Sequence, residues 1–272
     1  MKKTSILIFF FICVGFIAKA QELFTLTEPA SNMAARSVGI RMSSTIMNDK
    51  QLNINSIHIL PEAMLGVSKK VMIHLDAVIS GQNGGSYILD GASVYMKYRF
   101  YSQDDIHSHF RMALFGQFAW NNATIHQPAI DFKGHNTGYE MGVVSTKLVN
   151  KVALSSSVAF LHAMDNSTTE TFIYGDKHRN AINYTLSIGK LLLPKEYVSY
   201  NQMNVNGMLE FLCQTNLYSG NTFVDVAPVI QFIIKSKMRF DLGYRYNVSN
   251  KLEQSAPNGL LFRFEYNFFN VL

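Results

Sequence analysis

Cysteine is nearly absent from this 272-residue chain, which contains only Cys13 and Cys213. Cys13 lies in an apolar stretch near the N-terminus that we expect to be removed, and no small-residue pattern for lipid anchoring surrounds it. The single remaining cysteine cannot form an intrachain disulfide, even in the oxidising compartment that the leader predicts. The fold must therefore be stabilised in another way, and a sheet that closes on itself is one such way.

Domain boundaries and catalytic signatures are also missing. The chain has no Pro/Ser/Gly tract, charge block or low-complexity run, so we interpret the roughly 250 residues after the leader as one domain. It has no G-x-S-x-G elbow, phosphate-binding loop, H-E-x-x-H or C-x-x-C motif. The run from Asp104 to His109 contains possible metal ligands, but we interpret it as a solvated turn. We predict no enzyme activity, catalytic residue, cofactor or metal.

The N-terminus has the pattern of a secretion signal. Lys2 and Lys3 precede an apolar run over residues 6–17, which Ala18-Lys19-Ala20 follows. This order predicts a signal peptide over residues 1–20 with cleavage before Gln21. The apolar run is shorter than the ~20 residues that a membrane-spanning helix needs.

Removal of the leader changes the charge balance. The whole chain has 24 basic and 19 acidic residues, and three of the lysines but none of the acids lie in residues 1–20. The remaining chain carries +2, so the pI of 9.1 for the whole sequence overstates any affinity for nucleic acid. We predict no nucleic-acid partner.

Strict alternation of apolar and polar side chains predicts β-strands. From Phe223 to Tyr246, two alternating runs flank a short turn at residues 235–237. Successive side chains of a strand point to opposite faces, so each run has one apolar and one charged face. The pattern recurs and predicts twelve strands near residues 36–47, 54–67, 71–80, 92–101, 110–120, 138–148, 152–163, 181–191, 203–214, 223–234, 238–246 and 261–269. Pro228 removes a ladder hydrogen bond, so we expect a β-bulge there.

The connections alternate in length. Tight turns at residues 68–70, 149–151 and 235–237 alternate with long polar segments at 81–91, 121–137, 164–179 and 247–259. Short turns on one side and long loops on the other are typical of transmembrane barrels. The turns at 102–108 and 194–201 are of intermediate length. Residues 21–35 precede the barrel of residues 36–272, and either lie across its mouth as a plug or form a disordered terminus.

These features together resemble the outer-membrane β-barrels of Gram-negative bacteria. The last strand, 262–269, resembles their C-terminal assembly signal, which implies recognition by the barrel-assembly machinery and insertion into outer-membrane lipid. Residues 29–32 (PASN) also resemble the N-terminal segment of fatty-acid-transporter-like barrels. The resemblance implies an all-β fold: a transmembrane, antiparallel, up-and-down β-barrel of about twelve strands, with short periplasmic turns and long outer loops.

The inward-facing charges are the candidate functional residues. Strand parity assigns seven basic and seven acidic side chains to the lumen: Arg41, Lys97, Arg99, Arg111, Arg239, Arg245, Arg263, Glu62, Asp76, Glu140, Glu210, Asp225, Asp241 and Glu265. A lumen of twelve strands is intermediate between filled and open barrels. The balance predicts a narrow channel for small solutes, weakly ion-selective or plugged. Two alternatives remain: a structural, adhesive or secretion-associated barrel that acts through its outer loops, and a barrel enzyme such as a phospholipase.

Overall fold

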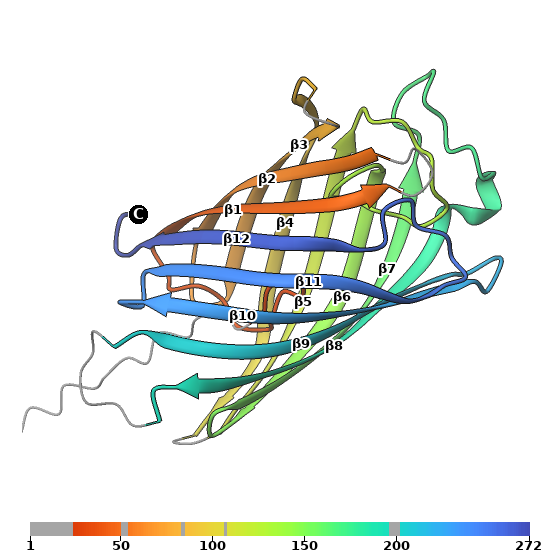
Figure 1. The fold of residues 1–272 in the computed structure, drawn as a ribbon. Helices are drawn as coiled ribbons and strands as arrows, with labels where there is room; N and C mark the ends of the chain where they lie inside the picture. The colour runs from red at the N-terminus through yellow and green to blue at the C-terminus, as the bar shows by residue number, and fades with distance from the viewer. Residues whose placement is uncertain (1–23, 50–53, 83–84, 106–107, 196–201) are drawn as a thin grey trace, which may run out of the picture.

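Twelve antiparallel strands form a closed barrel, which confirms the fold class. The computed structural model describes residues 24–272 except 50–53, 83–84, 106–107 and 196–201. The expected signal peptide, residues 1–20, and its cleavage site before Gln21 lie outside the described residues. Each strand pairs with its sequence neighbours, and β1 closes the barrel by pairing with β12 (Figure 1). The strands are β1 Ser37–Asp49, β2 Ile54–Gly66, β3 Val71–Gln82, β4 Ile88–Asp104, β5 Ser108–Asn121, β6 Thr137–Val149, β7 Val152–Met164, β8 Asn180–Leu193, β9 Asn204–Asn216, β10 Thr222–Ile234, β11 Met238–Asn250 and β12 Gly259–Phe268, with one 3-10 turn, η1 Asp176–Arg179.

Most of the strands are longer than the alternation predicted, and β2 is one residue shorter. They span 10 to 17 residues, and β4 is the longest. A register shift between Arg99 and Tyr101 lets β4 continue pairing with β5 beyond the predicted end at residue 101. The apolar pattern marks only the part of each strand with an apolar outer face. In β4, backbone pairing continues past that part over Ser102, Gln103 and Asp104, whose side chains are polar.

The β-bulge expected at Pro228 is absent, so that prediction was wrong. The register between β10 and β9 runs unbroken through Pro228 and Leu209. The register shift between β10 and β11 lies instead between Val224 and Asp225. Pro228 points outward, and only its pairing with β11 is interrupted. The barrel therefore accommodates the missing N–H on one side of a single strand.

The two ends of the barrel differ. One end, here called the turn end, has the connections at residues 67–70, 105–107, 150–151, 194–203 and 235–237, together with the C-terminus. The other, here called the loop end, has the connections at 50–53, 83–87, 122–136, 165–179, 217–221 and 251–258. Its longest connections, 122–136 and 165–179, are where the sequence predicted long loops.

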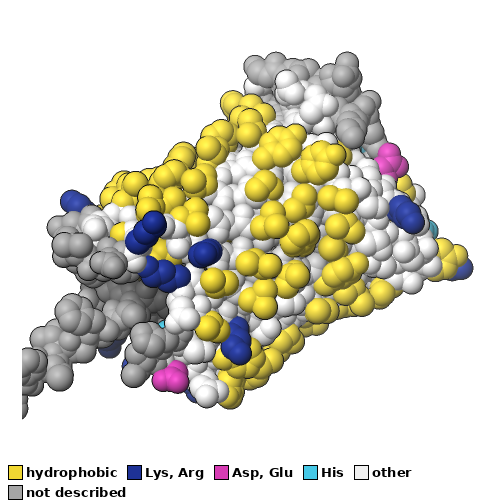
Figure 2. Space-filling model, turned by 60° about the horizontal axis from the view of Figure 1, so that its bottom comes forward, with side chains coloured by type: hydrophobic (Ala, Val, Ile, Leu, Met, Phe, Trp, Pro, Cys, Tyr) yellow, Lys and Arg dark blue, Asp and Glu magenta, His cyan; other side chains and the backbone are white. Residues whose placement is uncertain are grey.

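The outer surface of the barrel is apolar. Exposed aliphatic and aromatic side chains cover the strands, and charged side chains gather toward the two ends (Figure 2). In the described part of the chain, no helix has the length and hydropathy needed to cross a bilayer. An exposed apolar surface of this extent is foreign to water-soluble monomers, whereas a closed barrel leaves no unpaired strand edge and suits hydrocarbon.

Charge on the outer face should disrupt insertion. Leu186, in the middle of β8, is 43% exposed on the outer face. An Arg at the bilayer midplane costs ~2–4 kcal/mol, so Leu186→Arg should lower the folded yield strongly. The matched control is Thr185→Arg, because Thr185 is adjacent but lines the lumen. Folded and unfolded protein can be separated by gel mobility of unboiled samples. Equal losses for the two variants would contradict the assignment of the faces.

Candidate functional site

Residues 24–36, here called the inner segment, run inside the barrel at the turn end (Figure 1). The carboxylate of Glu210, in the middle of β9, accepts hydrogen bonds from three consecutive backbone N–H groups. These belong to Thr25, Leu26 and Thr27, with N···O distances of 2.8, 3.0 and 2.8 Å. A charged acceptor satisfying backbone donors is a strong interaction in a site that excludes water. Glu210 therefore fixes the start of the inner segment to the barrel wall.

Apolar packing holds the same part of the inner segment. Phe24 is 1% exposed and packs with Ala153, Met208 and Val229. Gly189 leaves room for its ring, since a Cβ added there would lie 3.3 Å from a ring carbon. The inward face of β7 consists largely of alanine and serine, so that strand leaves further space in the lumen. The small inward residues of β7 thus contribute to the cavity that the inner segment fills.

Two cations hold the next part of the inner segment. The Lys97 ammonium donates hydrogen bonds to the carbonyl oxygens of Pro29 and Ser31, at 2.7 and 2.9 Å. Arg111 donates to the Ser31 hydroxyl at 3.0 Å. The chain then leaves the lumen past Gly66, where an added Cβ would lie 2.1 Å from the Ala34 carbonyl oxygen. Only glycine fits this close approach of two backbones.

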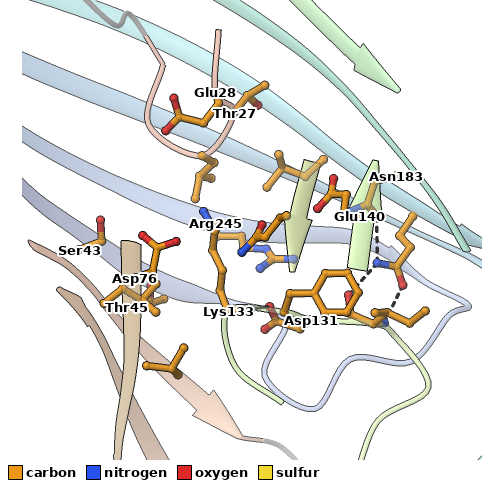
Figure 3. Close-up of a pocket in the computed structure, with 18 of the residues that line it drawn as sticks. Thr27, Glu28, Ser43, Thr45, Asp76, Asp131, Lys133, Glu140, Asn183 and Arg245 are labelled. Atoms are coloured by element: carbon orange, nitrogen blue, oxygen red, sulfur yellow. Dashed lines mark hydrogen bonds between the residues drawn. The ribbon is translucent and has the colours of Figure 1, made fainter. Parts of the chain in front are cut away.

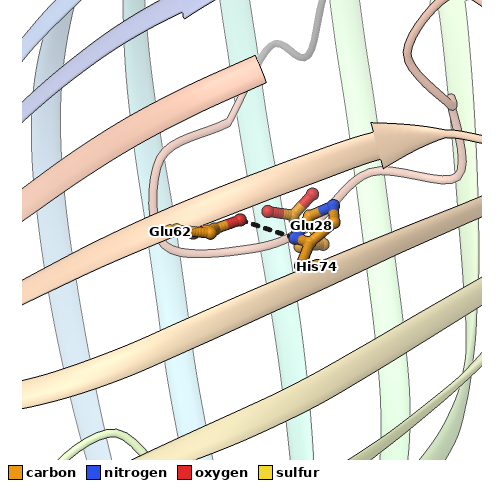
Figure 4. Close-up of side chains that lie close together, drawn as sticks. All are labelled: Glu28, Glu62 and His74. Carbon is orange, nitrogen blue, oxygen red and sulfur yellow. Dashed lines mark ion pairs between the residues drawn. The ribbon is translucent and has the colours of Figure 1, made fainter. Parts of the chain in front are cut away.

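Arg41 is the centre of the ion-pair network at the turn end. Its guanidinium, on a side chain 1% exposed, contacts Glu28 at 2.7 Å, Glu62 at 3.0 Å and Glu265 at 2.9 Å. Glu62 is also paired with His74 at 2.6 Å (Figure 4). Glu28 belongs to the inner segment, and the other carboxylates to neighbouring strands. Because buried carboxylates need partners, one arginine couples the segment to β2 and β12.

Glu28, Glu62 and His74 also have the residue types of a metal site. One ligand atom from each lies within 4.8 Å of the others. However, Arg41 contacts both carboxylates, and the Lys97 ammonium lies 3.8 Å from Glu28. A metal ion would have to displace or repel these fixed cations. We therefore interpret the cluster as an ion-pair network.

The docking of the inner segment through Glu28 should depend on pH. Burial raises the pKa of Glu28, but the charges of Arg41, His74 and Lys97 outweigh burial and hold that pKa well below its ordinary value of 4.5. When docking lowers the pKa of a carboxyl group, its ionised form stabilises the docked state at pH values above the ordinary pKa of the group. That contribution decreases as the pH falls below 4.5 toward the lowered value.

We expect the inner segment to stay protected from protease between pH 8 and 5 and to become more accessible below 4.5. Limited proteolysis with an acid-active protease can measure this in detergent. Glu28→Gln should remove much of the pH dependence, because it has no titrating carboxyl group at this position. Equal pH dependence in both proteins would show that Glu28 does not couple docking to pH.

A chamber of about 310 Å³ lies in the lumen beyond the inner segment. The inner segment bounds it toward the turn end, and the loops 122–136 and 251–258 bound it toward the loop end (Figure 3). Gln214 fixes the first loop by hydrogen bonds to the N–H and carbonyl of Ile130, at 2.7 and 2.9 Å. Ser255 joins the two loops by two hydrogen bonds to Gln127. Most of the residues that line the chamber are polar or charged, and aromatic rings of β4 and β5 also line it.

The fourteen lumen residues expected from parity occupy four environments. Around the inner segment and behind it lie Arg41, Glu62, Lys97, Arg111, Glu210, Arg239, Asp241, Arg263 and Glu265. Asp225 and Arg245 form an ion pair toward the loop end. Asp76 and Glu140 line the chamber. Arg99 lies at the turn end, where it donates to the Lys69 carbonyl.

Histidines elsewhere in the barrel have ordinary partners. His58 is hydrogen-bonded to Ser56 at 3.1 Å, and His162 to Asn180 at 2.7 Å. Asp104 pairs with His109 at 2.9 Å and with Arg111 at 2.7 Å, and residues 106–107 between them lie outside the described residues. These contacts favour the interpretation of the run from Asp104 to His109 as a turn.

Two residues of the candidate site, Glu28 and Lys133, were not predicted from the sequence. Glu28 is the only charged residue of the inner segment before Arg36, and this isolated charge was the available signal. Lys133 belongs to a loop that was expected to extend outward, whereas Ile125, Ile130 and Phe132 of that loop are buried. Those apolar residues in a long polar loop were the signal that the loop folds back into the barrel.

The fold is that of outer-membrane β-barrel channels. No family model matches the chain, and no curated protein matches its sequence. The COG4313 outer membrane channel from Pseudomonas putida F1 superposes with a TM-score of 0.58 over 89% of this chain and all of that one, at 9% identity. The NanC and KdgM porins give TM-scores of 0.49 and 0.46, at 9% and 10% identity, over 85% of this chain and 98% and 99% of theirs. At these identities the likeness is one of fold.

Proposed function

We propose that this barrel is an outer-membrane channel for small polar solutes whose resting state is closed by the inner segment. The observation that carries the proposal is the polar chamber inside a closed barrel with an apolar outer face. A barrel that served only as an anchor would have no need for unfilled polar space in its lumen. The turn end then faces the periplasm and the loop end faces outward, following the usual arrangement of such barrels.

We also propose that the chain reaches the outer membrane by export followed by insertion. The proposed leader, residues 1–20, directs export with cleavage before Gln21. The barrel-assembly machinery then inserts the chain into outer-membrane lipid through the aromatic outer face of β12, which includes the exposed Phe264 and Phe268.

The alternative function is a structural or adhesive barrel that acts through its outer loops. The many hydrogen bonds from the wall to the inner segment favour this alternative, because they describe a firmly closed lumen. The two functions differ in whether the inner segment leaves the lumen. A permanently docked segment would make the chamber inaccessible from the turn end.

Solute uptake into proteoliposomes tests the proposal. We expect the purified protein to admit small solutes and to exclude sugars of several rings. The reversal potential across a salt gradient should stay near zero, because most lumen charges are paired. A strong anion preference would contradict the balanced lumen. Absence of uptake, even after the inner segment is removed, would favour the structural alternative.

A further inference from the structure

Two carboxylates in the chamber lack the cation partners that most other described carboxylates of the lumen have. Glu62 is paired with Arg41 and His74, and Asp225 with Arg245. Asp76 instead accepts a hydrogen bond only from the Ser93 hydroxyl, at 2.8 Å, in the described structure. Within the described residues, no cation lies within 4.0 Å of Asp76 or Glu140. Unpaired carboxylates in a confined space attract a positively charged ligand.

The chain places one of its own ammonium groups between these carboxylates. Lys133 extends from the loop 122–136 into the chamber, with Asp76 and Glu140 on either side of it (Figure 3). It lines the same chamber as both carboxylates but forms no ion pair with either within the described residues. The loop holds Lys133 there through a turn in which Asp131 accepts its backbone N–H at 2.9 Å. A primary ammonium is thus already present in the chamber.

Aromatic rings lie between the two carboxylates along the wall. Asp76 is opposite Ser93 in the β3–β4 register, and Glu140 is opposite Gln117 in the β5–β6 register. Between them, Tyr95 and Phe115 stack with ring centroids 5.8 Å apart and an angle of 29° between the planes. Aromatic faces attract organic cations and pack against their methylene groups. The wall therefore offers contacts to both the charged and the apolar parts of such a ligand.

We propose that the chamber binds small organic cations with a primary ammonium group, with Lys133 as a tethered competitor. This inference rests on the proposed channel function, because it names the solute class that the channel would select. Asp76 and Glu140 would bind the ammonium, and Tyr95 with Phe115 would contact the carbon chain. A volume of about 310 Å³ is enough for a short aliphatic amine.

Three probes of equal chain length separate charge from size. Butane-1,4-diamine, butane-1,4-diol and butanedioate can be titrated calorimetrically into the full chain in detergent micelles. We expect the diamine to bind and the diol and dianion to bind at least tenfold more weakly. Asp76→Asn and Glu140→Gln should each weaken diamine binding about tenfold, as expected for loss of one charged partner. Unboiled gel mobility confirms that each variant is folded.

Lys133→Gln gives the opposite and more specific result. Removal of the competing ammonium should tighten diamine binding severalfold, whereas loss of a merely structural lysine would not. Lys251→Gln is the matched control, because Lys251 is also exposed on a loop-end connection but does not line the chamber. Unchanged or weaker diamine binding in Lys133→Gln would overturn the proposal, as would equal affinity for the three probes.

The two proposals fail in different ways. Uptake of all three probes at equal rates into proteoliposomes, without preferential binding, would support the channel and overturn the cation site. Tight diamine binding with no uptake, even after removal of the inner segment, would support the site and overturn the channel. Preferential binding together with preferential uptake of the diamine supports both.

Discussion

Deletion of residues 24–34 should convert the barrel from a poorly conducting to a freely conducting state. The inner segment fills the turn end of the lumen and is held by Glu210, Lys97 and Arg41. Its removal leaves the twelve-strand pairing intact, because none of these residues belongs to a strand. Water can then hydrate the wall charges that lose their partners. Single-channel recordings in planar bilayers should show a several-fold larger and longer-lived conductance than the full chain.

A second variant distinguishes the effect of the docking side chains from the effect of the volume that the inner segment occupies. Replacing residues 24–34 by a Gly/Ser sequence of equal length keeps the tether but removes the side chains that dock. We expect this variant to conduct intermittently, because the tether enters the lumen without being held. Conductance equal to that of the full chain in both variants would show that the inner segment does not close the barrel.

Replacement of Arg41 by methionine should cause the largest loss of stability. Arg41 contacts three carboxylates, and removal of one partner from a buried ion-pair network costs ~3–5 kcal/mol. The effect combines the undocking of Glu28 with repulsion between Glu62 and Glu265. The temperature at which unboiled protein loses its folded gel mobility should fall markedly. The folded yield should fall with it.

The control for this change is Arg99→Met. Arg99 also faces the lumen side of its strand, but it lies at the turn end and donates to one carbonyl oxygen there. Water can replace that contact, so this variant should behave almost as the unmodified protein does. A loss of stability equal to that of Arg41→Met would mean that the buried network is not the source of the effect.

The barrel itself was predictable because its determinants are local. Alternation in runs such as Val226–Phe232 fixes which side chains face out, and turn lengths fix which ends the strands share. The inner segment was not predictable, because its position depends on contacts with residues far away in the sequence. Thr25 meets Glu210 and Asp241, 185 and 216 positions away. No local pattern encodes such contacts.

Non-local contacts also account for the two predictions that the structure corrects. Pro228 was expected to cause a bulge from a local rule, but regular pairing with β9 on its other side keeps the strand in register. Lys133 was treated as part of an outward loop, because polarity dominates the loop's composition. Burial of Phe132 beside it, in a cluster with Leu161 of β7, brings the loop into the barrel mouth.

Disulfide trapping tests the docked inner segment most directly. The Ser187 hydroxyl of β8 donates to the Thr27 hydroxyl at 3.0 Å, so cysteines at both positions would lie close enough to bond. In a Cys213→Ala background, T27C with S187C should form a cross-link readily on mild oxidation of whole cells. The cross-linked channel should stay closed in bilayers and open more often after reduction. Failure of the cross-link to form in folded barrels would contradict a lumen closed by residues 24–36.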